Sequence, residues 1–472
     1  MSSIVTIVLL VLYSYTIVTS ITVLLLENRN PVKSLSWVLV LLFLPLIGLF
    51  FYLIFGQEYQ RHKLISKKSI RRLSNYPVKN LLDENTAELT DAHLKLIKLL
   101  NKSNETTVFQ HNKIEILANG ADTFKSMFDA IRSAKEHIHI EFFIFEDDRI
   151  SNELKELLIE KSLQGVRVRM IYDYLGSWVL SKKYLDELRK SGVYAKAYLP
   201  LRLRFGRSKI NYRNHRKILV VDGKIGFTGG LNVADRYIYG NRLGVWRDTF
   251  VRFEGEAVHG LQMQFLVDWY FVERKIINDK KYFPEPEKFE NNYVQIVSSG
   301  PDNDWQTILQ GISTAIMSAK NYVYIHTPYF VPPDTLLNVL QIAALQGVDI
   351  RLMIPEKSDS RLSDACTWSY LGQVLEAGVK VYVYNKGFLH SKAIVIDDSL
   401  SIVGSANMDE RSFGTNFEVN AFIYDLATSR KLKYLFVKDM RSCKKLTFDD
   451  WNRRKRKQKL KESIARLFSP LI

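Results

Sequence analysis

Cysteine is scarce in this chain: only Cys366 and Cys443 occur among 472 residues. Two cysteines do not make a disulfide framework, and a pair of reduced cytosolic thiols is expected. The sequence also has no H-E-x-x-H segment and no Cys/His cluster, so no metal and no other cofactor is expected. Low-complexity sequence is absent apart from a basic run near the C-terminus.

Acidic residues are outnumbered as well. The chain has 50 Asp and Glu against 66 Lys and Arg, which gives a formal net charge of +16. Such a balance predicts an anionic partner, either nucleic acid or acidic lipid. A chain of 472 residues is also too long for a single core, so two lobes and a further segment are expected.

Charge is missing altogether from two stretches near the N-terminus, residues 4–26 and 35–55. At about 1.5 Å per residue, each is long enough as a helix to span a hydrocarbon core of about 30 Å. A signal peptide is the alternative for the first stretch, but no basic segment precedes it and no small-residue cleavage site follows it. The sequence therefore predicts two transmembrane helices, forming an anchor over residues 1–56.

Basic residues after the second stretch predict the orientation of this anchor. Six of them fall within twelve positions: Arg61, Lys63, Lys67, Lys68, Arg71 and Arg72. The positive-inside rule then places the turn at residues 27–34 outside the cell and the large domain in the cytoplasm. Residues 57–110 are expected to form a basic juxtamembrane linker. An anchor in the cell membrane favours acidic lipid over nucleic acid as the partner.

One short motif occurs twice. Residues 215–222 read H-R-K-I-L-V-V-D and residues 390–397 read H-S-K-A-I-V-I-D. After six residues each is followed by a small pair and an asparagine, G-G-L-N at 229–232 and G-S-A-N at 404–407. Each copy predicts a strand, a tight turn and a second strand. Duplication of the whole set argues against two ordinary packed strand histidines.

The residue types of this motif suit a phosphate group. Side chains at positions i and i+2 of a strand share a face, so the histidine and lysine of each copy point the same way. Each copy thus offers a nucleophile or proton carrier, a fixed positive charge and an amide donor. The candidate site residues are His215, Lys217, Asn232, His390, Lys392 and Asn407.

The repeat extends beyond the motif. Residues 130–135 (A-I-R-S-A-K) recur as 315–320 (A-I-M-S-A-K), and each copy precedes a β-rich run, 137–145 or 322–330. The alternation of helix and strand that follows predicts parallel sheets covered by helices, an α/β fold. We expect a first half at residues 111–283 and a second at 284–472, packed by pseudo-twofold symmetry so that both His-Lys pairs face one cleft.

The paired motif resembles that of the phospholipase D superfamily. The resemblance implies two α-β-α sandwich halves and a metal-free reaction. One histidine attacks phosphorus to form a phosphohistidine, and the other protonates the leaving alcohol and then deprotonates the acceptor. It leaves open which histidine is the nucleophile. Asp222 and Asp397 belong to the motif and are either participants or structural caps of the turn.

A histidine with this task needs its second ring nitrogen held by an acceptor. Glu418, downstream of the second motif, matches the acidic residue that orients histidine in the superfamily. In the first half the candidate is Asp248, which lies five residues further from its histidine and implies a small insertion.

The anchor together with two motif halves is similar to bacterial cardiolipin synthases over essentially the full length. This resemblance implies transfer of a phosphatidyl group between two phosphatidylglycerol molecules, giving cardiolipin and glycerol. The expected partners are phosphatidylglycerol and anionic membrane lipid, with no nucleic acid. The alternative is a membrane-bound phospholipase D or related phosphodiesterase with water as acceptor. A non-catalytic lipid-binding scaffold is a third reading, which the two intact motifs oppose.

Two basic runs have open roles. The C-terminal run, residues 452–472, leads into a short apolar face and reads either as a lipid-facing amphipathic tail or as a solvated charge run. The second run either lines a headgroup entrance or is surface: Arg202, Arg204, Arg207, Lys209 and Arg213.

Overall fold

The computed structural model describes residues 2–26, 31–44, 48, 51–52, 89–200 and 211–469. Two N-terminal helices, α1 (Ser2–Leu26) and α2 (Pro31–Phe43), belong to a compact unit separate from the rest. Over these described ranges, no helix combines the length and hydropathy that a membrane crossing needs. The two predicted spans stay predictions, and the basic cluster at 61–72 lies outside the described residues.

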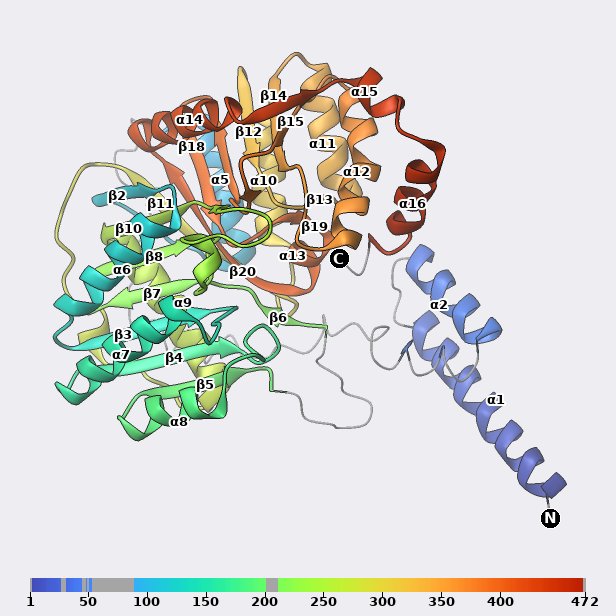
Figure 1. Ribbon diagram of the computed structural model, residues 1–472, viewed down its shortest axis with the longest axis horizontal. Coiled ribbons are helices and arrows are strands. Elements are labelled where there is room, and N and C mark those ends of the chain that lie inside the picture. Colours follow the sequence, from blue (N-terminus) through green and yellow to red (C-terminus); the bar gives the residue numbers. More distant parts are fainter. Residues whose placement is uncertain are drawn as a thin grey trace. The chain divides into compact units, whose positions relative to one another are not determined.

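The two halves predicted from the repeat are two β-sheets with the same strand order (Figure 1). The first runs β2 (Asn112–Leu117), β10 (Phe250–Gly255), β8 (Ile225–Gly229), β7 (Ile218–Val221), β3 (His137–Phe142), β4 (Arg167–Asp173), β5 (Tyr194–Tyr198). The second runs β11 (Tyr293–Ser299), β20 (Asn416–Tyr424), β18 (Leu400–Gly404), β17 (Ala393–Ile396), β12 (Tyr322–His326), β14 (Asp349–Pro355), β15 (Lys380–Tyr384). Each strand has its repeat partner at the same place, so the two-half α/β fold is confirmed.

The expectation of parallel sheets is wrong, because both sheets are mixed. Within the seven strands given for each half, β3–β4–β5 and β12–β14–β15 pair parallel, and the remaining neighbours pair antiparallel. The cause lies in the motif itself. Its two strands, β7–β8 and β17–β18, are joined by tight turns, and strands joined so closely can pair only as antiparallel hairpins.

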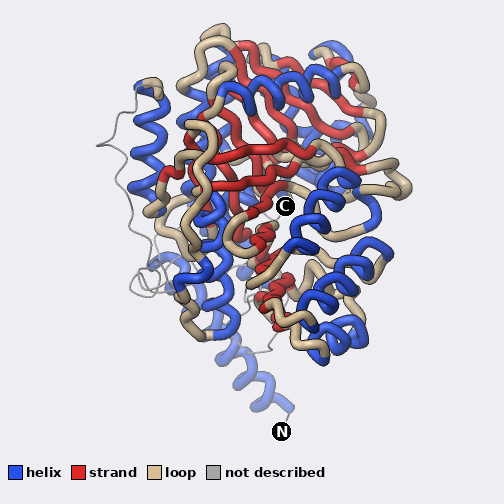
Figure 2. Tube along the Cα trace, turned by 90° about the vertical axis from the view of Figure 1, so that its left-hand side faces the viewer, coloured by secondary structure: helices blue, strands red, loops and turns tan. Residues whose placement is uncertain are grey.

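Helices cover the sheets, and Figure 2 shows the strands enclosed by them. The first half contributes α6 (Gly120–Ser133), α7 (Arg149–Leu163), α8 (Lys182–Lys190) and α9 (Ala257–Glu273). The second contributes α10 (Thr307–Met317), α11 (Asp334–Leu345), α12 (Arg361–Glu376) and α14 (Leu426–Met440). Side chains that cap the first turn fix where several of them begin; Asp148 and Asp425 each accept a backbone N–H three residues on. Each half has its own hydrophobic core.

Segments outside the repeat complete the second sheet. The predicted linker is described from residue 89 onward, where it forms α5 (Asp91–Asn104) and β1 (Val108–Phe109). Strand β1 pairs with β11, while β21 (Cys443–Leu446) extends the opposite edge beside β15. Helix α15 (Phe448–Asn452) leads into the C-terminal run, which forms α16 (Arg456–Arg466); both helices pack on α12. Both cysteines are free thiols, as expected.

Candidate active site

Two short strand pairs join the halves immediately before each motif histidine. The pairs are β6 (Arg213–Asn214) with the start of β20, and β16 (Phe388–Leu389) with β9 (Trp246–Arg247). Both pairs are parallel and are continued by an equivalent backbone hydrogen bond. The N–H of His215 donates to Phe417 O at 2.9 Å, and that of His390 donates to Arg247 O at 2.8 Å. Each histidine is therefore anchored to the backbone of the other half.

The acidic residues are exchanged between the halves in the same way. Nδ1 of His215 lies 2.9 and 3.0 Å from the carboxylate oxygens of Glu418, and Nδ1 of His390 lies 2.6 Å from Asp248. Both acids predicted from the sequence contact a motif histidine, but each contacts the histidine of the other half. The assignment of Asp248 to its own half's histidine is therefore wrong. The reason is local: each acid comes directly after two residues, 246–247 in β9 or 416–417 at the start of β20, that pair with a strand of the other half.

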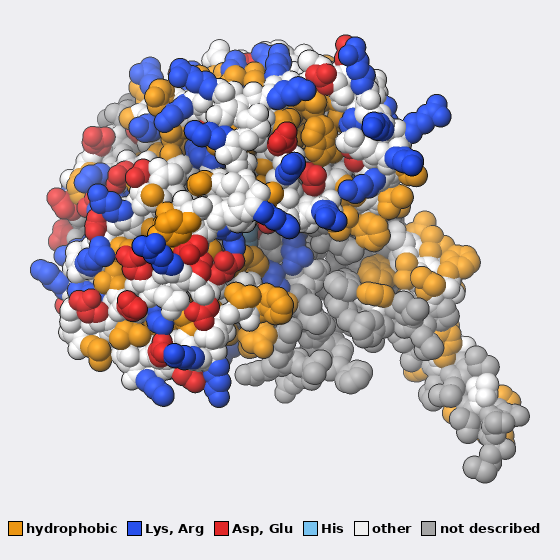
Figure 3. Space-filling view, in the orientation of Figure 1, with side chains coloured by type: hydrophobic (Ala, Val, Ile, Leu, Met, Phe, Trp, Pro, Cys, Tyr) orange, Lys and Arg blue, Asp and Glu red, His pale blue; other side chains and the backbone are white. Residues whose placement is uncertain are grey.

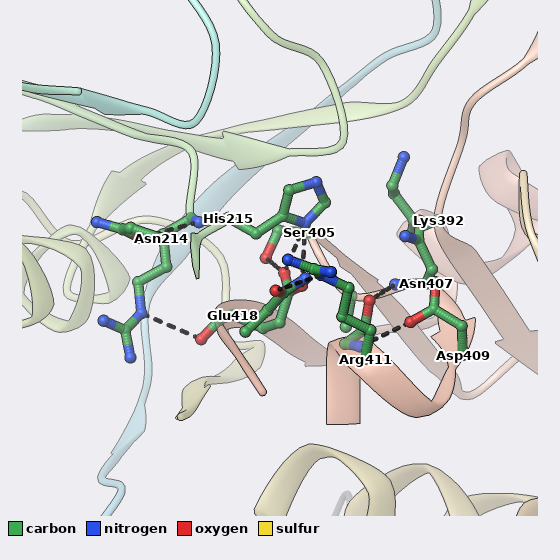
Figure 4. A network of polar contacts seen from close by, with 12 residues as sticks. Asn214, His215, Lys392, Ser405, Asn407, Asp409, Arg411 and Glu418 are labelled. Atoms are coloured by element: carbon green, nitrogen blue, oxygen red, sulfur yellow. Dashed lines mark hydrogen bonds and ion pairs between the residues drawn. The ribbon is translucent and has the colours of Figure 1, made fainter. Parts of the chain in front are cut away.

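The small residue of each motif is matched to the acid beside it. A side chain at Gly230 would overlap the Asp248 carboxylate and approach Lys392. At the equivalent position of the second half, the Ser405 hydroxyl donates a hydrogen bond to the longer Glu418 (Figure 4). The residue after the first motif glycine therefore differs between the halves. In the first half Asp248 leaves no room for a side chain at Gly230, and in the second half Glu418 accepts a hydrogen bond from Ser405.

Both lysines are buried in the same charged cluster. Lys217 donates to His215 O at 2.6 Å, and Lys392 donates to His390 O at 2.5 Å. Burial lowers the pKa of each lysine; Glu418 opposes this at Lys217, and Asp248 opposes it at Lys392, whose pKa falls to about 8. The charge on each lysine also acts on the other half's groups, so the structure brings the two His-Lys pairs together.

Burial makes both histidines weak bases. It lowers the pKa of His215 to about 4, although Glu418 opposes it. Burial and then the charge on Lys392 lower the pKa of His390 well below its usual range. Burial also raises the pKa of Asp248 to about 7. At Glu418 burial acts in the same direction, but His215, Lys217 and the Ser405 hydroxyl together outweigh it and the pKa of Glu418 is lowered. Burial thus favours the neutral form of both rings.

The two asparagines lie in the site in different states. Asn232 Nδ2 donates to the Tyr237 hydroxyl at 3.2 Å, and that hydroxyl lies 3.3 Å from His390 Nδ1. Asn407 Oδ1 is buried, and among the described residues it has no hydrogen-bond partner. The unpaired atom of Asn407 is thus an acceptor, while its side chain also forms a hydrogen bond with the Asp409 carboxylate.

Asp222 and Asp397 lie on the turns and cap the sheet from there. Asp222 accepts backbone N–H groups of Lys135, Glu136 and His137, all at 2.8 Å. Asp397 accepts the equivalent three, from Lys320, Asn321 and Tyr322, at 2.6 to 2.9 Å. Both aspartates have positive φ, 53° and 49°. Their contacts match the structural alternative left open by the sequence.

Several side chains at the site were not found from the sequence. Trp246, Tyr237 and Phe388 surround His390, with ring centroids 5.2 to 5.8 Å from its own. On the His215 side, Arg411 extends toward the His215–Glu418 pair (Figure 4). A signal for Arg411 did exist, because the repeat continues as G-x2-N-x3-R at 404–411 and 229–236.

Comparison with known proteins identifies this arrangement. A family model described as cardiolipin synthase, PLD-like domain, matches residues 127–249 and 312–440. "Cardiolipin synthase 2" of Bacillus cereus is 40% identical over 95% of this chain and 89% of its own length. The chain belongs to the cardiolipin synthase family. "Major cardiolipin synthase ClsA" of Bacillus subtilis, 38% identical, is covered over the whole of both chains.

The cardiolipin synthase chain has two further likenesses. A model described as phospholipase D-nuclease N-terminal matches residues 14–57, the region of the predicted anchor. The crystal structure of phosphatidylserine synthase from Haemophilus influenzae matches 80% of this chain and all of its own, with a TM-score of 0.61. At 16% identity this second likeness shows the shared fold alone.

Proposed function

We propose that the protein is a cardiolipin synthase, a phosphatidyltransferase that moves a phosphatidyl group from one phosphatidylglycerol to the terminal hydroxyl of another. Free glycerol leaves. Membership of the family along nearly the whole chain supports the enzyme class. The observation that carries the mechanism is the pair of buried histidines, each held at Nδ1 by a carboxylate of the other half.

The reaction proceeds in two balanced steps. In the first, Nε2 of one histidine attacks phosphorus, the bond from phosphorus to the glycerol oxygen breaks, and the second histidine gives that oxygen its proton. In the second, the acceptor hydroxyl loses its proton to the second histidine and attacks phosphorus, and the P–N bond breaks. The second histidine regains its proton and the first is freed when the P–N bond breaks, so the site ends as it began and glycerol is the released product.

The remaining groups act on charge and orientation. Glu418 and Asp248 hold Nδ1 of His215 and His390, so that Nε2 of each ring is the reactive nitrogen. Lys217 and Lys392 stabilise the charge that develops on the phosphoryl oxygens, and the amides of Asn232 and Asn407 add donors. An anionic phosphodiester raises the pKa of a buried imidazole beside it, so substrate binding favours protonation of one histidine.

Product analysis with phosphatidylglycerol as the only lipid tests this function. Purified full-length protein in detergent should release cardiolipin and glycerol in equal amounts, with phosphatidic acid a minor product. EDTA should not inhibit, and His215→Ala or His390→Ala should give neither product. Phosphatidic acid as the main product at every lipid concentration would show that water is the acceptor and that the alternative, a phospholipase D, is correct.

We further propose that the enzyme works at the cytoplasmic face of the cell membrane, held by two N-terminal spans. The uncharged stretches at 4–26 and 35–55 and the net charge of +16 support this location. Figure 3 shows Lys and Arg side chains spread over the upper part of one face, where the second half lies. Such a surface favours contact with anionic lipid.

Site-directed labelling tests the orientation. A cysteine placed at Asn30 should react with an impermeant maleimide in intact cells, while one placed at Ser69 should react only after the cells are opened. The opposite pattern would show that the topology is inverted. Labelling of neither position in intact cells would contradict the expectation that the turn lies outside the cell.

A further inference from the structure

Each histidine-orienting acid is contacted by an arginine, and the two arginines occupy positions that the repeat does not make equivalent. Arg216 directly follows the histidine of the first motif, where the second motif has Ser391. Arg247 directly precedes the acid of the first half, where the second half has Phe417. The position after the histidine thus supplies the arginine at one site, and the position before the acid supplies it at the other.

Both arginines donate to the equivalent atom, the backbone carbonyl oxygen of the acid. Nε of Arg216 donates to Glu418 O at 3.2 Å, and Nη1 of Arg247 donates to Asp248 O. These two acids are the ones that hold Nδ1 of the motif histidines. Different positions of the chain therefore make the same contact at the two sites.

A helix carboxylate also pairs with each guanidinium. Arg216 lies 2.6 Å from Asp268 of α9, and Arg247 lies 3.0 Å from Asp439 of α14. The four side chains are 2 to 14% exposed. At both sites the aspartate belongs to the half that supplies the histidine. Each arginine therefore joins a helix of that half to the acid of the other half.

The residues at the two exchanged positions without arginine contact the arginine or its partner. The ring of Phe417 lies 5.3 Å from the guanidinium of Arg216. Ser391 donates to Thr249 Oγ1 at 2.8 Å, and the same oxygen accepts from Arg247 at 2.9 Å. Phenylalanine and serine thus complete the surroundings of an arginine that comes from the other position.

Enclosed ion pairs of this kind contribute little to stability, because taking two charges out of water costs about as much as their attraction returns. They do fix a geometry, since a planar guanidinium with several acceptors cannot rotate without losing contacts. At the His215 site all three guanidinium nitrogens are used, because Nη2 of Arg216 donates to Ser299 O at 3.2 Å. The carbonyl of the acid is therefore held in place, and the acid with it.

We propose that Arg216 and Arg247 are positioning residues of the transfer reaction, each fixing the acid that holds a motif histidine. The inference rests on the proposed transferase function and adds the residues that hold its two acids. Neither guanidinium acts on the phosphate directly. Each sets the carboxylate that aims Nε2 of one ring at phosphorus, and a displacement of about 1 Å at such a distance from the chemistry costs up to about 100-fold in rate.

Cardiolipin formation and histidine-selective nitrogen labelling of the full-length enzyme test this role. Arg216→Gln and Arg247→Gln should each lower kcat about tenfold or more with little change in KM, because a charge-assisted contact to the acid is lost and none to the substrate. Arg216→Gln should shift the ring signals of His215 and leave those of His390, and Arg247→Gln should do the reverse. The unshifted ring reports that each variant is folded.

The pH profile gives a second measure at the His390 site. Burial raises the pKa of Asp248 to about 7, and the charge on Arg247 opposes the shift. Asp248 holds His390 as a carboxylate, so kcat/KM falls as pH falls through this pKa. Arg247→Gln removes the opposing charge and should move this acid limb to higher pH, whereas Arg247→Lys should leave it in place. The other groups that face Asp248 are unchanged in both variants: His390, Lys392, Lys217 and Tyr237.

Moving the arginine tests the exchange of positions. Arg247→Phe should lower kcat as Arg247→Gln does. Addition of Ser391→Arg then copies the His215 arrangement, with arginine after the histidine and phenylalanine before the acid. The double variant should recover the ring signals of His390 and part of the lost rate.

Arg351→Gln is the control, because Arg351 pairs with Asp349 in β14 and its printed contacts include neither acid. It should leave kcat and both rings unchanged. Unchanged kcat and ring signals in Arg216→Gln and Arg247→Gln, or equal shifts of both rings in all three variants, would overturn the positioning role. A double variant that recovers nothing would overturn the exchange of positions. Wild-type enzyme that forms phosphatidic acid in place of cardiolipin would instead overturn the transferase function.

Discussion

The ammonium group of Lys392 loses its proton within the pH range of an activity assay. Burial lowers its pKa to about 8, although Asp248 opposes the shift. Below this value the cation faces the phosphate, and above it the charge is lost. We therefore expect kcat/KM, which reports the free enzyme, to fall as pH rises through about 8.

Arginine at this position gives the matched comparison. A guanidinium keeps its proton throughout the assay range, so Lys392→Arg should remove the alkaline fall while lowering the maximal rate, because its geometry differs from that of an ammonium. A pH profile of kcat/KM for both proteins checks this. An unchanged alkaline limb in the variant would assign that titration to another group.

Site residues were predictable from the sequence where the same residue type occurs at the equivalent position of both halves. The roles of the ten candidates stay predictions; His215 and Lys217 lie between β6 and β7, and His390 and Lys392 between β16 and β17, outside the strands that the motif predicts for them. The exchange of Glu418 and Asp248 was not predictable, because sequence distance suggests that an acid serves its own motif, whereas the pairing depends on two-residue strands between the halves. Arg411 was missed although the repeat includes it, because a single arginine after the motif carries no chemical signal by itself; it lies in the short helix α13 (Glu410–Gly414).

At the scale of elements, the turn aspartates illustrate a motif residue with a structural role. Asp222 fastens the β7–β8 turn to the start of β3, and Asp397 does the same for β17–β18 and β12. Asp222→Ala or Asp397→Ala should lower the free energy of unfolding by about 1–3 kcal/mol, because three backbone donors lose their acceptor.

Urea unfolding midpoints measure this loss of stability. The activity of each variant, divided by its folded fraction, is measured alongside. We expect the folded fraction of each variant to retain most of its rate. Exposed Asp186, on α8, provides a control whose replacement by alanine should hardly move the midpoint. A large loss of kcat with an unchanged midpoint would make the aspartates participants in the chemistry.

Helix α16 carries an apolar row on its outward face. Its inner face packs on α12 through Ala465, whose carbonyl accepts from the Cys366 thiol at 3.0 Å. Outward, Leu460 is 62% exposed and Ile464 50%, amid lysines and arginines. This is the layout of a helix that lies against an anionic lipid surface.

Replacing both residues, Leu460→Ser with Ile464→Ser, should weaken binding to phosphatidylglycerol vesicles about tenfold or more, since each buried apolar side chain contributes about 1.5–3 kcal/mol. Vesicle co-sedimentation measures the change. Leu345→Ser, at a 75% exposed position on α11, is the matched control. Equal binding of all three proteins would place α16 away from the lipid.

Elements were predictable from local pattern, but their pairing direction was not. The apolar runs at 218–221 and 393–396 are strands, as the motif indicates. Helix–strand alternation suggests parallel neighbours, yet a tight turn between two motif strands already requires an antiparallel pair in each sheet. The tight turns therefore predicted the antiparallel pairing of the motif strands, whereas the alternation of helices and strands predicted parallel sheets.

At the scale of the whole molecule, each half depends on the other, because the acid of one half holds the histidine of the other half. Glu418→Gln, in the second half, should perturb the ring nitrogens of His215 in the first, and Asp248→Asn those of His390. Each change should lower kcat about 100-fold, because the ring loses its orienting acceptor. Histidine-selective nitrogen labelling separates the two rings, and the His→Ala variants assign the signals. A change confined to the histidine of the same half would contradict the exchanged pairing.

The exchanged acids also constrain the ancestry of the chain. Since neither half holds its own histidine, a single-half ancestor could not have built a complete centre from one copy. Two identical copies had to meet, and each would have lent its acid to the other. Two identical copies have the same residue at equivalent positions. Arg213 and Phe388 could therefore differ only after both copies were encoded in one polypeptide. Fusion of the two copies thus allowed the residues around the shared centre to differ between the halves.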